Sequence, residues 1–594
     1  MNTNLRSNFC FAAVFLIAPA LALAKTPATP EKLNQLYGEY WEENLQANPM
    51  LATQVGDNRF NDRYGAVTSG ERRATTKRIA EKYLARTAEF DPANLPADDR
   101  ISYDLLRYNL QQSLNALKFP SHFTPINQMF GQHLSFAQLG SGRTSQPFRT
   151  VKDFENWLAR AASFPAVIDG WITDMREGMR VGVVLPKALV LPMLPQLENL
   201  STADLNKNVY MSPVRKFPAS VSEDEQKRLT AAYTALVRQQ MVPAHRRLLV
   251  FMRDTYLPAG RESVGLSALP DGKAWYAFQA RSSTTTDLTP DAIHNIGLNE
   301  VARIRALLET ARMRAGFQGT LKEFLAHLNT APELRFKTRE EIQAAYESIR
   351  PRVDAKVPAY FGRLPKTPFE IRPVEPFREV AAAPAQYSSG LPDGSRPGIF
   401  YYNAYQPETR TRFTTTAFFL HEAIPGHHFE GSLSREHASL PSFRRFGGSG
   451  AYSEGWGLYS ELLGEEMGLY DDPWQYVGRL SAEIWRAARL VIDTGLHAKG
   501  WTREQSIAYF LENVPQGEGV ATQEVERYIG VPGQALSYKI GEIKIRELRA
   551  RAEKALGRKF DIREFHDEIL THGSVPLSVL DAALNRWLVT KGAS

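Results

Sequence analysis

The stretch TTTAFFLHEAIPGHHFE, residues 414–430, predicts both a helix and the chemistry that this helix carries. Threonine is a preferred residue before the first turn of a helix, and the apolar run 417–420 follows three of them. We therefore expect His421 and Glu422 on a buried helix. A histidine followed at once by a glutamate, with a further histidine nearby, is typical of sites that hold a metal ion beside a general base.

The spacing of these histidines does not suit a straight helix. At about 100° per residue, His427 would point away from His421, whereas His428 would share its face but lie about 10 Å further along the axis. Two nitrogens that each bind one zinc ion at about 2.0–2.1 Å cannot be that far apart. Pro425 lacks the N–H that would bond to the His421 carbonyl, and Gly426 tolerates unusual dihedrals. We therefore predict a bulge in the helix at these two residues.

Removing Ile424 and Pro425 from the stretch leaves HEAGHH, in which the histidines have the standard four-residue separation. On this basis His427 is the second predicted ligand, and His428 is the alternative. The other interpretation is a helix end whose histidines cap the helix or lie in the core. We prefer the metal site.

A zinc ion held by two histidines needs a third protein ligand and an open position for water. The segment AYSEGWGLYSELLGEE, residues 451–466, contains Glu454 and Glu461 on one helix face. Glu454 follows His427 by 27 residues, enough for the chain to turn back, so we predict it as the third ligand. Glu461 is expected to orient a ligand histidine. A solvated acidic face is the alternative, but the aromatic neighbours favour burial.

Glu422 is the predicted general base. Beside a metal ion it would take a proton from water and pass it to the leaving amine. A developing oxyanion needs another donor, and Tyr538, which opens a helix after a Gly/Pro turn, is our candidate. Lys539 or Arg546 would then bind a substrate carboxylate.

Two further segments carry candidate residues. Arg489, Asp493 and His497 recur at four-residue steps, so they can form one charged row on a helix. If buried, this row supports the site or contacts substrate, and if exposed it is an ordinary salt-bridged face. The segment RPGIFYYNAY, residues 396–405, predicts a short strand that includes Tyr402. It would be either an edge strand that pairs with a peptide substrate or a hairpin that packs on helices.

The composition indicates a folded protein. The 594 residues are 43% hydrophobic and 11% aromatic, which is ample material for a core. Apolar and charged residues recur at three- and four-residue steps, so we predict a mostly α-helical fold with a small β element near residues 395–405. The formal net charge is +6, but the basic residues are spread along the chain, so we predict no nucleic-acid partner.

Residues 1–24 are predicted to be a signal peptide, because Arg6 precedes an apolar run that ends in an Ala-x-Ala pattern. Cys10, the one cysteine, lies in this segment and lacks the small-residue neighbours of a lipid-anchored cysteine. The mature chain would thus have no disulfide. No later run reaches about 18 apolar residues, so we predict no stable membrane insertion. We expect a periplasmic or secreted protein, cleaved near Ala24.

We divide the mature chain into an N-terminal helical region, residues 25–260, and a catalytic helical region, residues 261–594. Residues 257–287 are rich in Gly, Pro, Ser and Thr and predict a long loop. This loop would be a surface excursion or the wall of a binding cleft.

Several of these segments resemble a bacterial family known as domain of unknown function 885. The shared motifs are HEAIPGHH, YSEGWGLYSE, RLVIDTGLHAKGW and GQALSYKIG in this order, with PDGKAWYAFQA upstream and HGSVPL near the end. They cover most of the mature chain. More distantly, the first two motifs are similar to those of thimet-type oligopeptidases and Taq-type carboxypeptidases, which carry His-Glu-x-x-His and a later glutamate ligand.

The resemblance implies one zinc ion per chain on His421, His427 and Glu454, with Glu422 as the base. It also implies a large helical metallopeptidase-like fold, which can be bilobed, with the site in a cleft or channel that admits short peptides. The resulting hypothesis is an exported zinc metallopeptidase that hydrolyses short peptides. The alternatives are a zinc amidase or cell-wall peptide hydrolase, and a periplasmic peptide-binding protein without catalytic activity.

Overall fold

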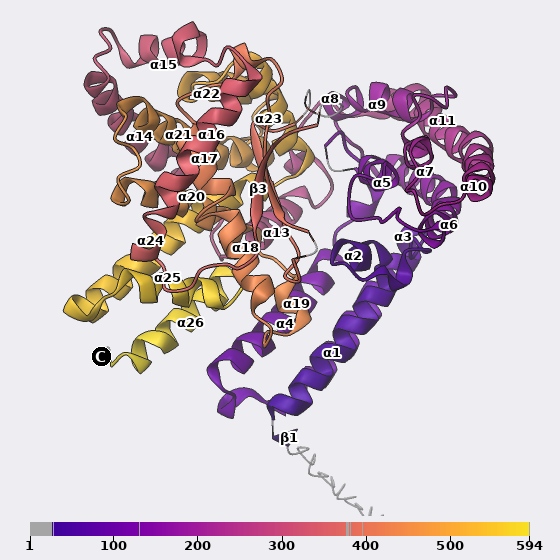
Figure 1. Ribbon diagram of the computed structural model, residues 1–594, viewed down its shortest axis with the longest axis horizontal. Coiled ribbons are helices and arrows are strands. Elements are labelled where there is room, and N and C mark those ends of the chain that lie inside the picture. Colours follow the sequence, from indigo (N-terminus) through magenta and orange to yellow (C-terminus); the bar gives the residue numbers. More distant parts are fainter. Residues whose placement is uncertain are drawn as a thin grey trace, which may run out of the picture.

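The structure, a computed structural model, describes residues 26–27, 29–129, 131–375, 379, 382–394 and 396–592. The predicted signal peptide and its cleavage site near Ala24 lie outside these residues. Within them the chain is mostly helical with a small sheet, which confirms the predicted fold class (Figure 1). Among the described helices, none combines the length and apolar character that crossing a membrane requires.

Residues 30–259 form the helices α1 to α12. Their bounds are α1 (Pro30–Ala47), α2 (Pro49–Gln54), α3 (Ser69–Ala88), α4 (Ala97–Ala116), α5 (Gln132–Gly140), α6 (Val151–Ala162), α7 (Phe164–Val181), α8 (Lys187–Val190), α9 (Met193–Leu200), α10 (Glu223–Leu236), α11 (Val242–Phe251) and α12 (Leu257–Ala259). Local sequence sets several of these ends. Thr150 and Asp153, for example, form a reciprocal capping box that starts α6.

The chain after residue 260 supplies the helices α13 to α26, among them those that carry the candidate site. Their bounds are α13 (Gly272–Thr284), α14 (Pro290–Arg314), α15 (Leu321–Thr330), α16 (Arg339–Asp354), α17 (Thr415–Glu422), α18 (His427–Glu436), α19 (Ser442–Arg445), α20 (Gly450–Glu466), α21 (Pro473–Ala498), α22 (Arg503–Asn513), α23 (Glu518–Gly530), α24 (Ser537–Leu556), α25 (Ile562–Thr571) and α26 (Leu577–Thr590). Two long pairs form its frame, because α14 packs along α21 and α20 packs along α24.

Helix α13 lies where a long loop was predicted, so that prediction is wrong for this part of residues 257–287. Trp275 and Tyr276 are buried on α13, and the Tyr276 hydroxyl donates to Oδ1 of Asp493 at 2.6 Å. Serine, threonine and glycine lower helix propensity, but burial of an aromatic face outweighs such small preferences. The aromatic residues therefore belong to the core.

The predicted β element is present as a three-stranded sheet. Strands β3 (Phe369–Pro373), β4 (Ala385–Ser388) and β5 (Gly398–Tyr402) lie in the order β3-β5-β4, with β5 parallel to β3 and antiparallel to β4. Two further residue pairs, β1 (Thr26–Pro27) and β2 (Phe90–Asp91), form a short parallel ladder.

Strand β5 is central and antiparallel to β4, so of the two alternatives for residues 396–405 the free edge for a peptide is wrong and the hairpin is present. Tyr402 on this strand is 2% exposed, and its hydroxyl donates to Oε1 of Gln343 at 3.3 Å. Its ring also packs on Tyr346, with centroids 5.6 Å apart. Tyr402 is thus a core residue, which does not fit the predicted contact with a substrate.

Two large hydrophobic clusters hold the helices together. The first joins helices α5–α11 to α14 and to α21–α23, and the second joins α1, α3 and α4 to the sheet, to α17–α20 and to α24–α26. In Figure 1, α5–α11 lie together on the right, whereas the sheet and the C-terminal helices lie to the left. Because each cluster includes residues from both sides of residue 260, the division there stays a prediction.

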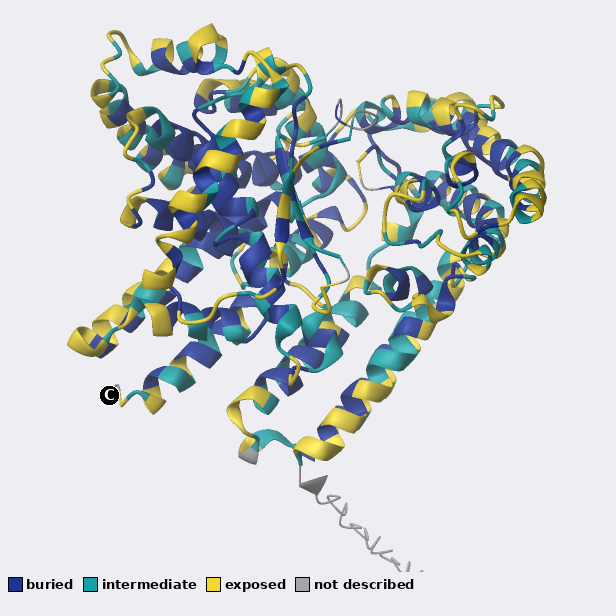
Figure 2. Ribbon diagram, in the orientation of Figure 1, coloured by how far each residue is buried: buried dark blue, intermediate teal, exposed yellow. Residues whose placement is uncertain are grey.

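Helix α21 is the most deeply buried element near the site. Every residue from Val477 to His497 is buried, and Figure 2 shows this region as the dark centre of the left part. A helix buried all round is usually apolar, but α21 also carries several charged side chains. Buried charges are tolerated only with partners. The helices that pack against α21 must therefore supply charged groups of opposite sign or hydrogen-bond partners.

Candidate metal centre

A turn of four residues interrupts the helix that the sequence predicts through the two histidines. Helix α17 ends at Glu422 and α18 begins at His427. The prediction of a bulge within one helix is therefore wrong, although the deformation lies where Pro425 and Gly426 were expected to cause it.

Two close approaches hold this turn against α20. The indole N–H of Trp456 donates to the Pro425 carbonyl at 2.7 Å. A Cβ atom on Gly426 would lie 1.9 Å from the carbonyl oxygen of His421, so no larger residue fits there. On α20, a Cβ atom on Gly457 would lie 2.6 Å from the His421 ring. Gly426 therefore allows the turn to pass close to the His421 carbonyl, and Gly457 allows α20 to pack against the His421 ring.

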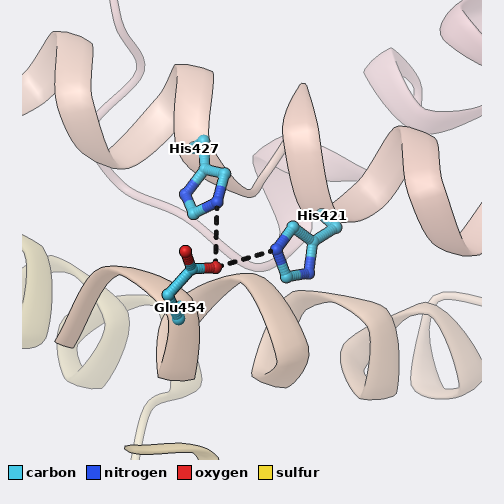
Figure 3. A group of neighbouring side chains, drawn as sticks. All are labelled: His421, His427 and Glu454. Atoms are coloured by element: carbon cyan, nitrogen blue, oxygen red, sulfur yellow. Dashed lines mark ion pairs between the residues drawn. The ribbon is translucent and has the colours of Figure 1, made fainter. Parts of the chain in front are cut away.

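The turn brings His421 and His427 to Glu454 of α20 (Figure 3). Nε2 of His421 lies 3.4 Å from Oε2 of Glu454, and Nε2 of His427 lies 3.5 Å from the same oxygen. The two imidazole rings are perpendicular, with centroids 4.8 Å apart. One possible ligand atom from each residue lies within 4.8 Å of the others, so three helices place three donors around one point.

His428, the predicted alternative to His427, faces the sheet. Its Nδ1 lies 2.8 Å from the hydroxyl of Tyr387 on β4, and its ring packs on Phe369 of β3 with centroids 4.6 Å apart. Burial lowers its pKa to about 4, so it is a neutral core histidine at pH 7. Of the two candidates, the structure brings His427 into the cluster.

Glu461 holds His421 through the other ring nitrogen. Nδ1 of His421 lies 2.8 Å from Oε1 of Glu461, which is 1% exposed. A carboxylate can only accept here, so Nδ1 carries a proton and Nε2 is the ring nitrogen that faces Glu454. Glu461 thus occupies the position expected of an orienting group.

Ser453 and Glu430, which the sequence analysis missed, hold His427 in a similar way. Nδ1 of His427 lies 3.3 Å from Oγ of Ser453, and that hydroxyl donates to Oε2 of Glu430 at 2.9 Å. Ser453 directly precedes Glu454, and Glu430 lies one helical turn after His427. Seeking a polar partner for the second nitrogen of each histidine would have found them.

The charges of the cluster stabilise one another. Burial lowers the pKa of His421, but the carboxylates of Glu454 and Glu461 outweigh this effect and raise it to about 9. Burial also acts against the charged form of His427, but Glu454 raises its pKa. Burial raises the pKa of Glu454, yet the two histidines bring it well below its ordinary value. The carboxylates thus favour positive charge at this point, which a bound cation would supply.

Both predicted catalytic residues lie beside the cluster. Glu422 directly follows His421, is half-buried, and its charge contributes to raising the pKa of His421 and of His427. The ring of Tyr538 stacks on that of His421, with centroids 6.4 Å apart and planes 20° apart. Its hydroxyl accepts a hydrogen bond from Nη2 of Arg527 at 3.2 Å.

Lys539 is buried away from solvent, so the prediction that it binds a substrate carboxylate is wrong. Its Nζ lies 2.7 Å from Glu483, 2.9 Å from Glu542 and 3.0 Å from Glu300. Burial would lower its pKa, but the three carboxylates raise it above its ordinary value. Its charge is therefore already balanced within the protein.

The predicted charged row on α21 is buried, but its members bond to other elements. Arg489 pairs with Glu524 of α23, with Nη2 and Oε2 2.8 Å apart. Asp493 accepts from the hydroxyl of Tyr276, and His497 hydrogen-bonds to two backbone groups, both at 3.0 Å. The exposed salt-bridged face is thus wrong and the buried alternative holds, with no ion pair among the three in the described residues. Asp493 and His497 support the core, whereas Arg489 reaches Tyr538, with its Cζ 4.4 Å from the ring centroid.

Residues 49–584 match the family described as a bacterial protein of unknown function, DUF885. The chain belongs to this family. No curated protein matches the chain. A candidate lipoprotein from Colwellia psychrerythraea has a crystal structure similar to this DUF885 protein, with 28% identity and a TM-score of 0.88, over 94% of this chain and 99% of that one.

Two further solved structures are less similar. A candidate lipoprotein of unknown function from Shewanella oneidensis has 18% identity and a TM-score of 0.71, over 93% of this chain and 99% of that one. It shares the fold. A candidate oligoendopeptidase F from Bacillus anthracis has 10% identity and a TM-score of 0.24, over 86% of this chain and 96% of that one, and this similarity is too low to support a function.

Proposed function

We propose that this DUF885 protein is an exported zinc-dependent metallopeptidase that hydrolyses short peptides. The observation that supports this most is the contact of His421 and His427 with one oxygen of Glu454. A general-base candidate, Glu422, directly follows the first histidine. Together these residues are those that a water-activating hydrolase needs.

The donor set and its spacing fit zinc. Two histidines and one carboxylate form a common three-ligand set of catalytic zinc sites. Donors at about 2.0–2.1 Å from one ion in tetrahedral geometry lie about 3.3–3.4 Å from each other. The distances of 3.4 and 3.5 Å from Glu454 to His421 and His427 agree with this value. The side chains of His427 and Glu454 are 18% and 21% exposed, so water can reach the site.

The residues around the cluster have separate roles in this proposal. Bound zinc would polarise the scissile carbonyl and acidify a water molecule. Glu422 would take a proton from the attacking water and pass it to the nitrogen of the leaving amine. Tyr538 accepts a hydrogen bond from Arg527, so its own hydroxyl proton is free to stabilise the oxyanion. Glu461 and Ser453 keep both Nε2 atoms directed at the site.

The export part of the proposal is supported by the sequence of residues 1–24, with its apolar run and Ala-x-Ala pattern. We place the mature protein in the periplasm or outside the cell. Cell fractionation, together with the N-terminal sequence of the purified protein, would test this part. A mature protein that begins before Ala24 would contradict the cleavage site.

A digest of a peptide library by the zinc-loaded protein, followed by mass spectrometry with and without a chelator, tests the activity. Glu422→Gln should keep zinc but lower hydrolysis at least about 100-fold, because it removes the general base. His421→Ala should lower the zinc content. Glu466→Gln, on the exposed end of α20, is the control and should behave as the parent. An active Glu422→Gln variant would refute the assignment of the base.

A further inference from the structure

Two arginines from different helices contact Tyr538. Arg489 of α21 places its Cζ 4.4 Å from the centroid of the tyrosine ring. Arg527 of α23 donates from Nη2 to the tyrosine hydroxyl at 3.2 Å. The same ring stacks on His421. The two guanidinium groups therefore lie one tyrosine ring away from a candidate zinc ligand.

These two arginines share one carboxylate. Glu524 lies 2.8 Å from Nη2 of Arg489 through Oε2, and 3.4 Å from Nη1 of Arg527 through Oε1. Oε2 also accepts from the hydroxyl of Tyr528 at 2.6 Å. Among the described residues, no second carboxylate forms an ion pair with either arginine. The pair therefore carries one positive charge that the protein does not balance locally.

Each arginine also has a buried donor without a partner. Nη1 of Arg489 and Nε of Arg527 make no hydrogen bond within the part of the chain that the structure describes. Arg489 as a whole is 4% exposed. A buried N–H without an acceptor and a buried charge without a counter-charge are both costly. Water could satisfy the donors, but only an anion would also balance the charge.

The geometry of the charged groups suggests which anion this is. Guanidinium groups present their N–H donors in a fork that matches the two oxygens of a carboxylate. A free C-terminal carboxylate is the anionic group that every unmodified peptide carries. The side chain of Arg527 is 16% exposed and that of Arg489 is 5% exposed, so Arg527 is the group that an incoming carboxylate can reach first.

We propose that Arg489 and Arg527 form a subsite for the C-terminal carboxylate of a peptide substrate. The subsite rests on the proposed peptidase function and narrows it to enzymes that act near the carboxyl end of short peptides. It takes the role that the sequence predicted for Lys539 or Arg546; the charge of Lys539 is balanced by three carboxylates.

The test compares two N-acetylated tetra-alanine peptides, one with a free C-terminal acid and one with a C-terminal amide. Their affinities are measured by titration calorimetry on the full mature chain, zinc-loaded and carrying Glu422→Gln to prevent turnover. We expect the acid to bind at least about tenfold more tightly, as one charge-assisted interaction provides. Adding Arg527→Gln should remove this preference, and Arg527→Lys should keep part of it.

Arg503→Gln is the matched control. It breaks the ion pair of Arg503 with Glu526, which lies on α23 like Arg527, and it should leave the preference for the acid intact. Equal or unmeasurable binding of the two peptides to the parent would overturn the subsite, as would an Arg527→Gln variant that weakens both peptides equally. Hydrolysis by the wild-type enzyme is followed separately. Absence of cleavage of any peptide would refute the proposed function, whereas the binding comparison alone decides on the subsite.

Discussion

The hydrogen bonds that orient the two histidines differ in strength, so their loss should weaken zinc binding unequally. The bond between Nδ1 of His421 and the buried carboxylate of Glu461 is 2.8 Å long. The bond between Nδ1 of His427 and the neutral hydroxyl of Ser453 is 3.3 Å long. A hydrogen bond to a charged group contributes about 1.5–3 kcal/mol, and a neutral one about 0.5–1.5 kcal/mol.

These energies translate into a ranking of variants. Glu461→Ala should weaken zinc binding about 13- to 160-fold, whereas Ser453→Ala should weaken it about 2- to 13-fold. Glu461→Gln should fall between the parent and Glu461→Ala, because the amide oxygen still accepts from Nδ1 but carries no charge.

Competition with a chromophoric chelator at constant pH gives the zinc dissociation constants, and melting temperatures show whether each variant is folded. Glu466→Ala is the matched control, because this residue lies on the same helix but pairs with Arg549, its Oε1 2.7 Å from Nη1, away from the cluster. It should bind zinc like the parent. A larger loss for Ser453→Ala than for Glu461→Ala, or parental affinity in both, would refute the ranking.

Three other predictions follow from the same structure. His427→Gln should lose zinc by elemental analysis, whereas His428→Gln should keep one zinc per chain; the reverse result would show that the wrong histidine has been assigned. Gly426→Ala should destabilise the protein by about 1–3 kcal/mol in denaturant unfolding through the clash with the His421 carbonyl. Gly431→Ala should leave the stability unchanged, because the nearest atom would be 4.0 Å from the new Cβ. Equal losses of stability in the two variants would contradict the clash at Gly426. Finally, the melting temperature should fall as pH drops from 6.5 to about 4, because burial lowers the pKa of several histidines that stay neutral when folded but gain a proton on unfolding. Each such histidine lowers the free energy of unfolding by about 1.4 kcal/mol per pH unit below 6.5. Burial raises the pKa of Asp493 to about 7, so this group offsets about one of the histidines. A constant melting temperature would contradict the prediction. These histidines are His133, His245, His428, His497 and His566.

The fold class and the family were predictable because both depend on local patterns. Helical periodicity is visible in any window of the chain, and the motifs around His421 and Glu454 are contiguous strings. The proximity of these two residues and His427 could also be anticipated, since the ligand requirements of zinc restrict which residue types and separations can meet.

The partners of charged residues could not be predicted in the same way, because they depend on which helices pack together. Lys539 lies in a motif next to Tyr538, and nothing in that motif shows that Glu300 and Glu483 from two other helices surround it. Similarly, Arg527 lies outside the quoted motifs, and its hydrogen bond to Tyr538 crosses the turn between α23 and α24. Side chains next to each other in sequence can thus have opposite roles, one balanced in the core and one beside the site.

The interruption of the helix between His421 and His427 follows from the number of residues inserted between them. A π-type bulge adds one residue to a helical turn, so it converts a four-residue separation into five. The separation here is six, because both Ile424 and Pro425 are inserted. One bulge cannot absorb two residues, so the helix has to end and start again, as it does between Glu422 and His427. The position of the second imidazole is then set by the turn and its contacts with α20, and not by helical periodicity. For this reason we expect substitutions in the turn to affect zinc binding as strongly as substitutions of the groups that orient the ligands.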